Sequence, residues 1–92
     1  ELAKHLLDRR AAACVQIEGP IESHYRWEGR DCCENEYRLV IKTAASRKDE
    51  VRELLREIHP YDQPQILTLE SADVDPGYAT WVGEQTSEEN KD

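Results

Sequence analysis

The stretch "ACVQIEGPIESHYRWEGRDCCENEYRLVIKT", Ala13 to Thr43, decides the fold of this chain. Apolar and polar residues alternate on both sides of a Gly-Pro pair at positions 19 and 20, which is typical of half-buried β-strands. The Gly-Pro pair itself indicates a bulge or bend within the first strand. We expect a turn from Gly29 to Glu34, after which a second strand returns antiparallel to the first. The stretch therefore predicts one long β-hairpin.

A helix is predicted after the hairpin, from Ser46 to His59. Its apolar residues recur at i, i+3, i+4 and i+7 and form one stripe that can pack against a sheet. These residues are Val51, Leu54, Leu55 and Ile58. Ser46, with Asp49 three residues later, forms a capping-box pattern. Pro60 ends the helix, because a proline disfavours helical geometry in the residue before it.

The remaining segments complete the predicted order of elements. Residues 1–13 read as the second half of a helix, Gln65–Glu70 as a short strand and Tyr78–Gln85 as a short closing helix. The chain has no methionine and no capping residue before Glu1, so we expect a strand and the first half of a helix upstream. That strand would complete βαββαβ, an α+β ferredoxin-like sandwich with a long hairpin and a short C-terminal helix. We expect one domain at residues 1–85, lacking its first strand, and a disordered acidic tail at 86–92.

The composition limits what the chain can do. Its 92 residues include no Phe, so the core is small, and small domains often complete their core against a partner subunit. The net charge of −8 argues against nucleic acid and anionic membranes and gives a weak attraction for cations, although it would also serve solubility alone. No apolar run reaches the ~20 residues of a membrane span. Three cysteines, an odd number, favour a reducing compartment.

Several motifs occur in one order at close spacing: "AACVQI", "SHYRWEG", "EYRLVIKT", "HPY-x-x-P-x-I" and "Y-x-x-W". In these motifs, from Leu2 to Trp81, the chain resembles the CutA family of divalent-cation tolerance proteins. The resemblance implies a cytoplasmic homotrimer of ferredoxin-like subunits, similar in architecture to the PII signalling proteins. It also implies a link to copper or another divalent metal, and no catalytic reaction is firmly assigned to the family.

The candidate metal ligands are Cys14 and His59. Imidazole is a common metal ligand, and a thiolate suits soft metals such as copper. The resemblance strengthens both ligand assignments, because His59 lies in the H-P-Y motif and the family commonly has a cysteine at the position of Cys14. Two alternatives stay open: His59 could simply favour the dipole of its helix, and Cys14 could be a small buried hydrophobe. We interpret Cys32 and Cys33, in the expected turn, as incidental to the family's function, although two thiols in a loop could bind a soft metal. We interpret His24 as a surface residue.

A second set of residues is expected at an inter-subunit cleft or interface. Most are aromatic, and aromatic side chains bury a large area while keeping a polar tip for a hydrogen bond. The set comprises Tyr25, Trp27, Glu28, Lys42, Tyr61 and Trp81. Glu28 could instead be a carboxylate ligand or only shape its turn, and Lys42 could bind an anion or pair with an acidic neighbour.

Three functions compete for this chain. The first is a metal-binding trimer in divalent-cation tolerance, and the second is a PII-like signalling trimer that binds a small anion or nucleotide in its inter-subunit clefts. The third is a scaffold whose stability is its function. We do not expect an enzyme, because the chain has no G-x-S-x-G, no H-E-x-x-H and no Gly-rich phosphate loop. A thiol–imidazole pair of Cys14 and His59 would also lack a third, orienting group.

Overall fold

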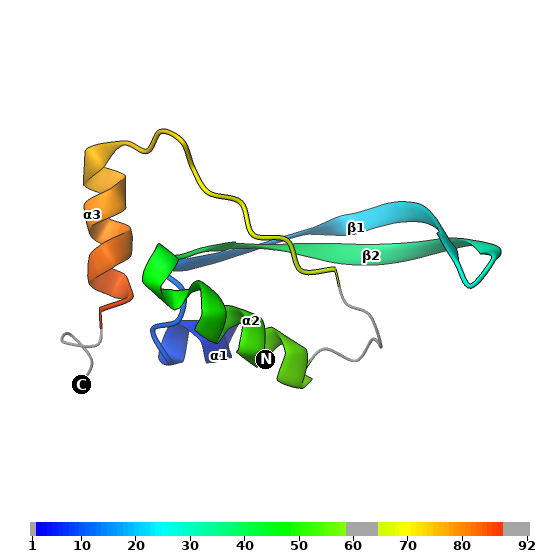
Figure 1. Ribbon diagram of the computed structural model, residues 1–92, viewed down its shortest axis with the longest axis horizontal. Helices are drawn as coiled ribbons and strands as arrows, with labels where there is room; N and C mark the ends of the chain where they lie inside the picture. Colours follow the sequence, from blue (N-terminus) through cyan, green and yellow to red (C-terminus); the bar gives the residue numbers. More distant parts are fainter. Residues whose placement is uncertain (1, 59–64, 88–92) are drawn as a thin grey trace.

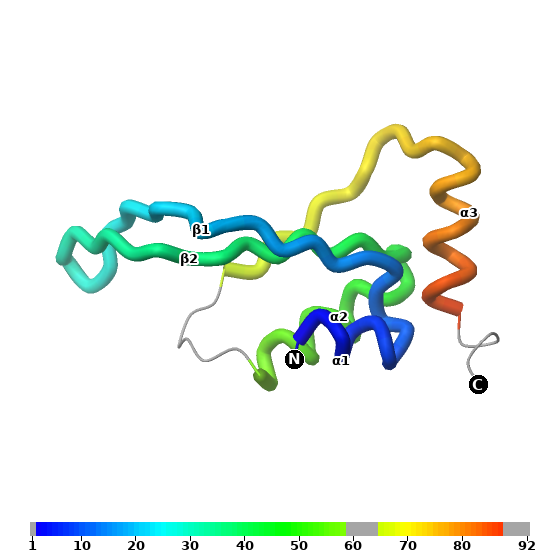
Figure 2. The backbone as a smooth tube through the Cα atoms, turned by 180° about the vertical axis from the view of Figure 1, so that it is seen from behind, coloured from blue at the N-terminus to red at the C-terminus, as the bar shows by residue number. Residues whose placement is uncertain are grey.

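The computed structural model describes residues 2–58 and 65–87, and it has the α+β architecture that the sequence predicts (Figure 1). The elements are α1 (Leu2–Asp8), β1 (Cys14–Trp27), β2 (Arg30–Lys42), a 3-10 turn η1 (Ala45–Arg47), α2 (Lys48–Ile58) and α3 (Pro76–Gln85). Helices α1 and α2 lie side by side against one end of the β1–β2 hairpin, and the rest of the hairpin projects beyond them (Figures 1 and 2).

The two strands pair antiparallel along almost their whole length, and Trp27 is opposite Arg30 at the tip. The connection is therefore a two-residue loop, with Glu28 at φ 50° and Gly29 at φ 76°. Positive φ at both loop positions matches the right-handed twist of the flanking strands. The turn predicted from Gly29 to Glu34 is wrong in extent. The strand β2 already begins at Arg30, so both adjacent cysteines lie within it rather than in a turn.

The predicted bulge is confirmed, because the register of the pairing shifts between Glu18 and Ile21. Gly19, at φ 145°, makes it possible. A Cβ atom at this position would lie 2.7 Å from Cδ1 of Tyr37, closer than real Cβ contacts allow. The extra residue also reverses the alternation of β1. Even-numbered residues beyond the bulge share the face that odd-numbered residues occupy before it.

The core lies between the helices and the base of the hairpin. It consists of Leu6, Ala11, Ala12, Val51 and Leu54, with Leu2, Val15, Ile41 and Leu55 partly buried against it. The predicted stripe of α2 thus faces the core as far as Leu55, whereas Ile58 stays 48% exposed. The capping box at Ser46 is wrong: η1 precedes α2, and its cap residue, Ala44, makes no side-chain capping bond. The helix ends at Ile58, and His59 lies outside the described residues.

The short strand predicted at residues 65–70 is wrong. Within the described residues the sheet has only β1 and β2, and the segment that leads to α3 has no regular secondary structure (Figure 1). A strand needs the backbone of a second strand about 4.8 Å away, and here the segment has no such partner among the described residues. Leu67 and Leu69 are 73% and 89% exposed as a consequence. The strand expected upstream of α1 stays a prediction.

The N-terminus of α3 is capped by Asp75. Its carboxylate accepts hydrogen bonds from the backbone N–H groups of Gly77 and Tyr78, at 3.1 and 3.3 Å. Pro76 occupies the first turn, where its missing N–H costs nothing and its fixed φ suits a helix. The prediction of a short closing helix is confirmed, and the helix begins two residues earlier than predicted.

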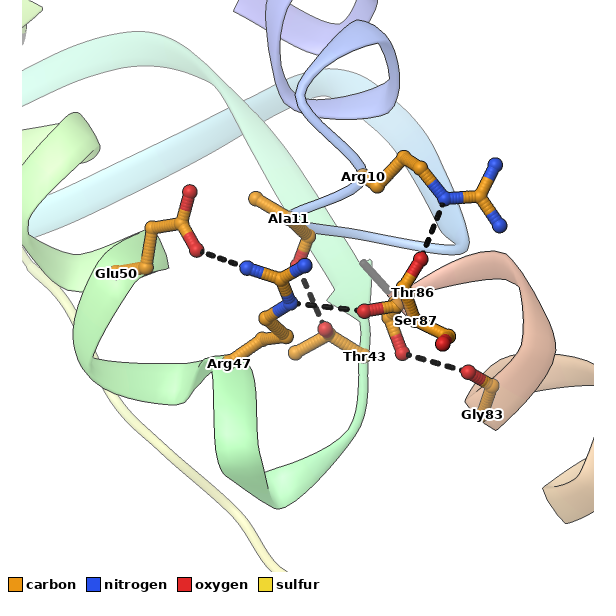
Figure 3. Close-up of polar contacts among 8 residues, drawn as sticks. All are labelled: Arg10, Ala11, Thr43, Arg47, Glu50, Gly83, Thr86 and Ser87. Carbon is orange, nitrogen blue, oxygen red and sulfur yellow. Dashed lines mark hydrogen bonds and ion pairs between the residues drawn. The ribbon is translucent and has the colours of Figure 1, made fainter. Parts of the chain in front are cut away.

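Two arginines hold the other end of α3 (Figure 3). Arg10 donates from Nε to the carbonyl of Ser87 at 2.9 Å and from Nη2 to that of Glu84 at 2.5 Å. Arg47 donates from Nε to the carbonyl of Thr86 at 2.8 Å. Helix C-terminal carbonyls lack partners within the helix, and cations favour that end of its dipole. Thr86 is buried and Ser87 is bonded, so neither belongs to the disordered tail expected from residue 86.

The chain is extended and exposes a large surface for its length. Its extents are 47 × 28 × 20 Å and its radius of gyration is 15.2 Å, against about 12 Å for a compact chain of this length. Its accessible surface is 7381 Å², whereas a compact monomer of 10.7 kDa exposes about 5,500 Å². Large exposed side chains include Ile17, Tyr25, Trp27, Tyr37, Leu67, Leu69, Tyr78 and Trp81.

Candidate metal site on the hairpin

Three different metal-binding side chains meet on one face of the hairpin: Glu22, His24 and Cys33. Their ligand atoms all lie within 4.8 Å of one another. The Nε2 atom of His24 is 2.6 Å from Oε2 of Glu22 and 3.7 Å from Sγ of Cys33. Among the described residues this is the one group of three or more His, Cys, Asp or Glu side chains with such spacing.

Strand geometry explains why these residues meet. Glu22 and His24 are two positions apart on β1, and alternate residues of a strand point to the same face. Cys33 is directly opposite His24 in the ladder, where Cβ atoms lie about 4.5–5.5 Å apart. The cluster is therefore set by the backbone of the hairpin alone and needs no long-range contact.

The distances suit a tetrahedral metal ion. Zinc lies about 2.0–2.1 Å from histidine nitrogen and about 2.3 Å from cysteine sulfur, so their separation around one ion is about 3.6 Å. Cys33 and His24 already lie 3.7 Å apart. The contact between Glu22 and His24 is a hydrogen bond of 2.6 Å and would have to open to about 3.4 Å around an ion. Rotation of the exposed Glu22 side chain is enough for this change.

The same contacts do not suit nucleophilic catalysis. In a catalytic triad the histidine bonds the nucleophile through one ring nitrogen and the orienting carboxylate through the other. Here both Cys33 and Glu22 contact Nε2 of His24. One nitrogen cannot donate to the carboxylate and accept the thiol proton at the same time. Three ligand atoms that converge on one point instead match metal coordination.

The cluster is exposed to solvent. The side chains of His24 and Glu22 are 66% and 67% exposed, and Cys33 is an exposed free thiol. Toward the tip it is flanked by an exposed ion pair, Arg26 Nε to Asp31 Oδ1 at 3.3 Å. The net charge of −8 attracts cations to such a surface, while the ion pair leaves the immediate surroundings close to neutral.

The opposite face of the hairpin carries Tyr25, which donates a short hydrogen bond to the carboxylate of Glu34. This bond is the main reason why the pKa of Tyr25 is raised to about 12, with smaller contributions from burial and from the charges of neighbouring acidic groups. Cys32 is directly opposite Tyr25, so the two adjacent cysteines point to opposite faces. Only Cys33 belongs to the metal-ligand cluster.

Comparison with known proteins decides the family. The family model described as CutA1 divalent ion tolerance protein matches residues 1–85. The chain belongs to the CutA1 family. The divalent-cation tolerance protein CutA of Thermus thermophilus is 35% identical over 85 residues, which cover 92% of this chain and 82% of that protein. The CutA homolog of Xenopus laevis is 34% identical over 84 residues, and the chain spans only 56% of its length.

Solved CutA1 structures show the same fold. The CutA1 of Ehrlichia chaffeensis superimposes with a TM-score of 0.88 at 28% identity, covering 94% of this chain and 80% of that one. A protein of Nostoc sp. PCC 7120 described as PII-like protein CutA gives 0.87 at 27% identity, covering 94% and 84%. The predicted fold class is thereby confirmed. The CutA of Archaeoglobus fulgidus is described as periplasmic and that of Arabidopsis thaliana as chloroplastic. No helix in the described part of this CutA1 chain is long and apolar enough to cross a membrane.

The metal site predicted from the sequence is not assembled in the described residues. Cys14 is half-buried as the first residue of β1, opposite Lys42, and it joins no metal-ligand cluster there. His59 and Tyr61 lie outside the described residues, so a site that pairs Cys14 with His59 stays a prediction. His24 is a surface residue, as interpreted, with its side chain 66% exposed, whereas Cys33 lies in β2 and not in the predicted turn. The structure places the two side chains 3.7 Å apart, and whether Cys33 is incidental to function stays open.

The other predicted cleft residues fall in two places. Trp27 and Glu28 lie at the exposed tip of the hairpin. Lys42 lies at its base, with Nζ 6.0 Å from the ring centroid of Tyr78, whose own ring is 5.6 Å from that of Trp81. A cation beside two half-exposed aromatic rings is compatible with an anion-binding cleft. That role, and with it the PII-like alternative, stays a prediction.

Proposed function

We propose that this CutA1 chain binds a divalent cation at Glu22, His24 and Cys33 and acts in divalent-cation tolerance or homeostasis. The observation that carries the proposal is the convergence of a carboxylate, an imidazole and a thiol on one face of the hairpin. The family to which the chain belongs supplies the biological setting. The proposed activity is binding rather than catalysis, because the contacts at His24 suit coordination and not proton relay.

The donor set indicates which cations the site would take. Thiolate and imidazole favour copper and zinc, whereas magnesium and calcium prefer sites built only from oxygen atoms. Copper is therefore compatible with the ligands. Because Cu(II) can oxidise a thiol, Zn²⁺ is the better probe: it has no redox chemistry and binds the same donor types.

A homotrimer is part of the proposal. Each subunit of a trimer has two interfaces, and standard interfaces bury about 800 Å² per partner, so about 1,600 Å² per subunit would be covered. The accessible surface of this chain, 7381 Å², exceeds the roughly 5,500 Å² of a compact monomer by a similar area. Tyr25 and Trp27, exposed on the face away from the helices, are the residues that we expect such an interface to cover.

A reducing compartment such as the cytoplasm is the proposed location. All three cysteines are free thiols in the structure, and the proposed site needs Cys33 as a thiolate. An oxidised thiol could not coordinate the cation. The periplasmic and chloroplastic descriptions of two relatives belong to those proteins, so localisation of this chain has to be measured directly.

Titration of the reduced protein with Zn²⁺ in a calorimeter tests the proposal, with Cys33→Ser and Cys32→Ser compared. We expect about one ion per chain for the unchanged protein and for Cys32→Ser, because Cys32 points to the opposite face. Cys33→Ser removes the softest ligand and should lower the affinity at least about tenfold, equivalent to about 1.4 kcal/mol.

A third variant, Cys14→Ser, separates the hairpin site from the site predicted from the sequence. The hairpin proposal expects it to bind like the unchanged protein. If Cys14→Ser abolished binding while Cys33→Ser left it intact, the cation would bind at Cys14 and the hairpin assignment would be wrong. Equal binding by all three variants would exclude a cysteine-based site at any of these positions.

A further inference from the structure

The cluster on the hairpin has the form of a site that exchanges its cation. We infer, on the basis of the proposed function, that the site passes its cation directly to an acceptor that brings a ligand of its own. Three features carry this inference: the number of ligands, their exposure, and the open space beside them.

The number of ligands leaves one coordination position available. Structural zinc sites are closed by four protein ligands, whereas sites with three protein ligands keep a fourth position for water or another molecule. Glu22, His24 and Cys33 provide three, and no other His, Cys, Asp or Glu among the described residues joins the group. A bound ion would therefore carry one ligand from solution.

The available position is accessible. His24 and Glu22 are about two-thirds exposed, and the cluster lies on the part of the hairpin that projects beyond α1 and α2 (Figure 2). A shallow hollow of about 370 Å³ adjoins it, lined by His24, Tyr25, Arg26 and Asp31. An acceptor ligand can thus reach the ion while the protein still holds it.

Exchange follows from ordinary ligand substitution. The incoming acceptor ligand forms a bond to the cation and displaces the bound water. Glu22 then dissociates, and its carboxylate can regain its hydrogen bond with Nε2 of His24 only after that nitrogen has left the cation. The imidazole and the Cys33 thiolate leave as further acceptor ligands bind, and Cys33 takes up from water the proton that it released on metal binding. No oxidation state changes at any step.

The rate law distinguishes this route from simple release. The full chain is loaded with Zn²⁺, and its loss is followed with the metallochromic chelator 4-(2-pyridylazo)resorcinol at increasing chelator concentration. Direct transfer predicts a rate that rises in proportion to the chelator. A rate that does not depend on the chelator would mean that Zn²⁺ leaves before the acceptor arrives, which would overturn the inference while leaving the proposed binding intact.

Asn35 allows the fourth position to be filled. It lies opposite Glu22 on β2 and two positions from Cys33, hence on the same face of the hairpin. Asn35→Asp replaces an amide by a carboxylate of the same shape and should slow the transfer about tenfold, equivalent to about 1.4 kcal/mol. Gln16→Glu adds the same charge on the other face near the base of β1 and is the matched control.

The outcomes are separable. Slower transfer in Asn35→Asp but not in Gln16→Glu supports an open fourth position. Equal slowing in both variants would reflect charge alone and would overturn the assignment of that position, as would no slowing in either. Failure of the unchanged chain to bind Zn²⁺ in the calorimeter would refute the proposed function itself, and the inference with it.

Discussion

Replacing Arg47 by methionine should strongly destabilise the folded chain. The side chain of Arg47 is only 10% exposed, and it connects α2 to the end of α3. Its Nε donates to the carbonyl of Thr86 at 2.8 Å, and its Nη1 lies 2.5 Å from Oε1 of Glu50 (Figure 3). Methionine keeps much of the apolar stem but donates no hydrogen bond, so packing changes little and the polar contacts are lost.

The magnitude follows from these contacts. Hydrogen bonds to charged groups contribute about 1.5–3 kcal/mol each, and removing one partner of a buried ion pair costs about 3–5 kcal/mol. Glu50 is 33% exposed, so water can replace part of what it loses. The carbonyl of buried Thr86 has less access to water and would lose its side-chain donor. We therefore expect a loss of about 3–5 kcal/mol, a large share of the total stability of a small domain.

Urea unfolding at one fixed protein concentration measures this loss, because assembly would otherwise shift the apparent stability. Arg26→Met is the matched control. Arg26 also pairs with an acidic residue, Asp31 at 3.3 Å, but the two side chains are 77% and 87% exposed. Such a pair contributes about 0–1 kcal/mol. If the two variants lost equal stability, to within about 1 kcal/mol, burial of Arg47 would not explain its contribution and the reasoning would be wrong.

Two further predictions concern the opposite face of the hairpin. Trp27→Ala should weaken the proposed trimer by on the order of 3–5 kcal/mol if the indole is buried on assembly, and sedimentation of the unchanged chain as a stable monomer at micromolar concentration would contradict the trimer itself. In an alkaline titration followed by tyrosinate absorbance, Tyr25 should ionise near pH 12, and Glu34→Gln should move it toward the ordinary value of about 10. The pKa is higher in the folded state, so the contact stabilises the fold fully below about pH 10 and this contribution is lost as the pH rises to about 12. Unchanged titration in Glu34→Gln would show that the hydrogen bond is not the cause.

Local periodicity was enough to predict the hairpin, its bulge and the helices α2 and α3. These elements depend on alternation, on the spacing of one apolar stripe and on Gly and Pro at defined positions. The contacts of Arg10 and Arg47 with the end of α3 could not be read in the same way. They join residues 39 to 77 positions apart, and nothing in the local sequence of either arginine specifies its partner. The sequence of residues 65–70 has a strand-like composition. Whether it forms a strand depends on a neighbouring strand to pair with, which the local sequence does not specify.

The sequence does not reveal the Glu22–His24–Cys33 cluster, because its pattern predicts the turn of the hairpin too late in the chain. Asn-Gly and Asp-Gly are the usual signals for a two-residue hairpin loop, and a glutamate at positive φ is uncommon. Glu28-Gly29 therefore did not stand out against the polar run that follows it. Once Trp27 is placed opposite Arg30, counting back along both strands brings His24 opposite Cys33. The information was present in the sequence, but it depended on the exact loop length.

The bulge is equally necessary for the proposed site. Before it, Ile17 is opposite Leu39, and continuing that register to the tip would place His24 opposite Cys32, on the other face of the sheet. The extra residue at Gly19-Pro20 shifts the pairing by one, so that Glu22 and His24 join the face of Cys33. Because both cysteine positions could complete a Glu-His-Cys group, comparison of Cys32→Ser with Cys33→Ser tests the register as well as the ligand. Loss of Zn²⁺ binding only in Cys32→Ser would mean that the strands pair without the bulge, and the structural basis of the proposed site would then be wrong.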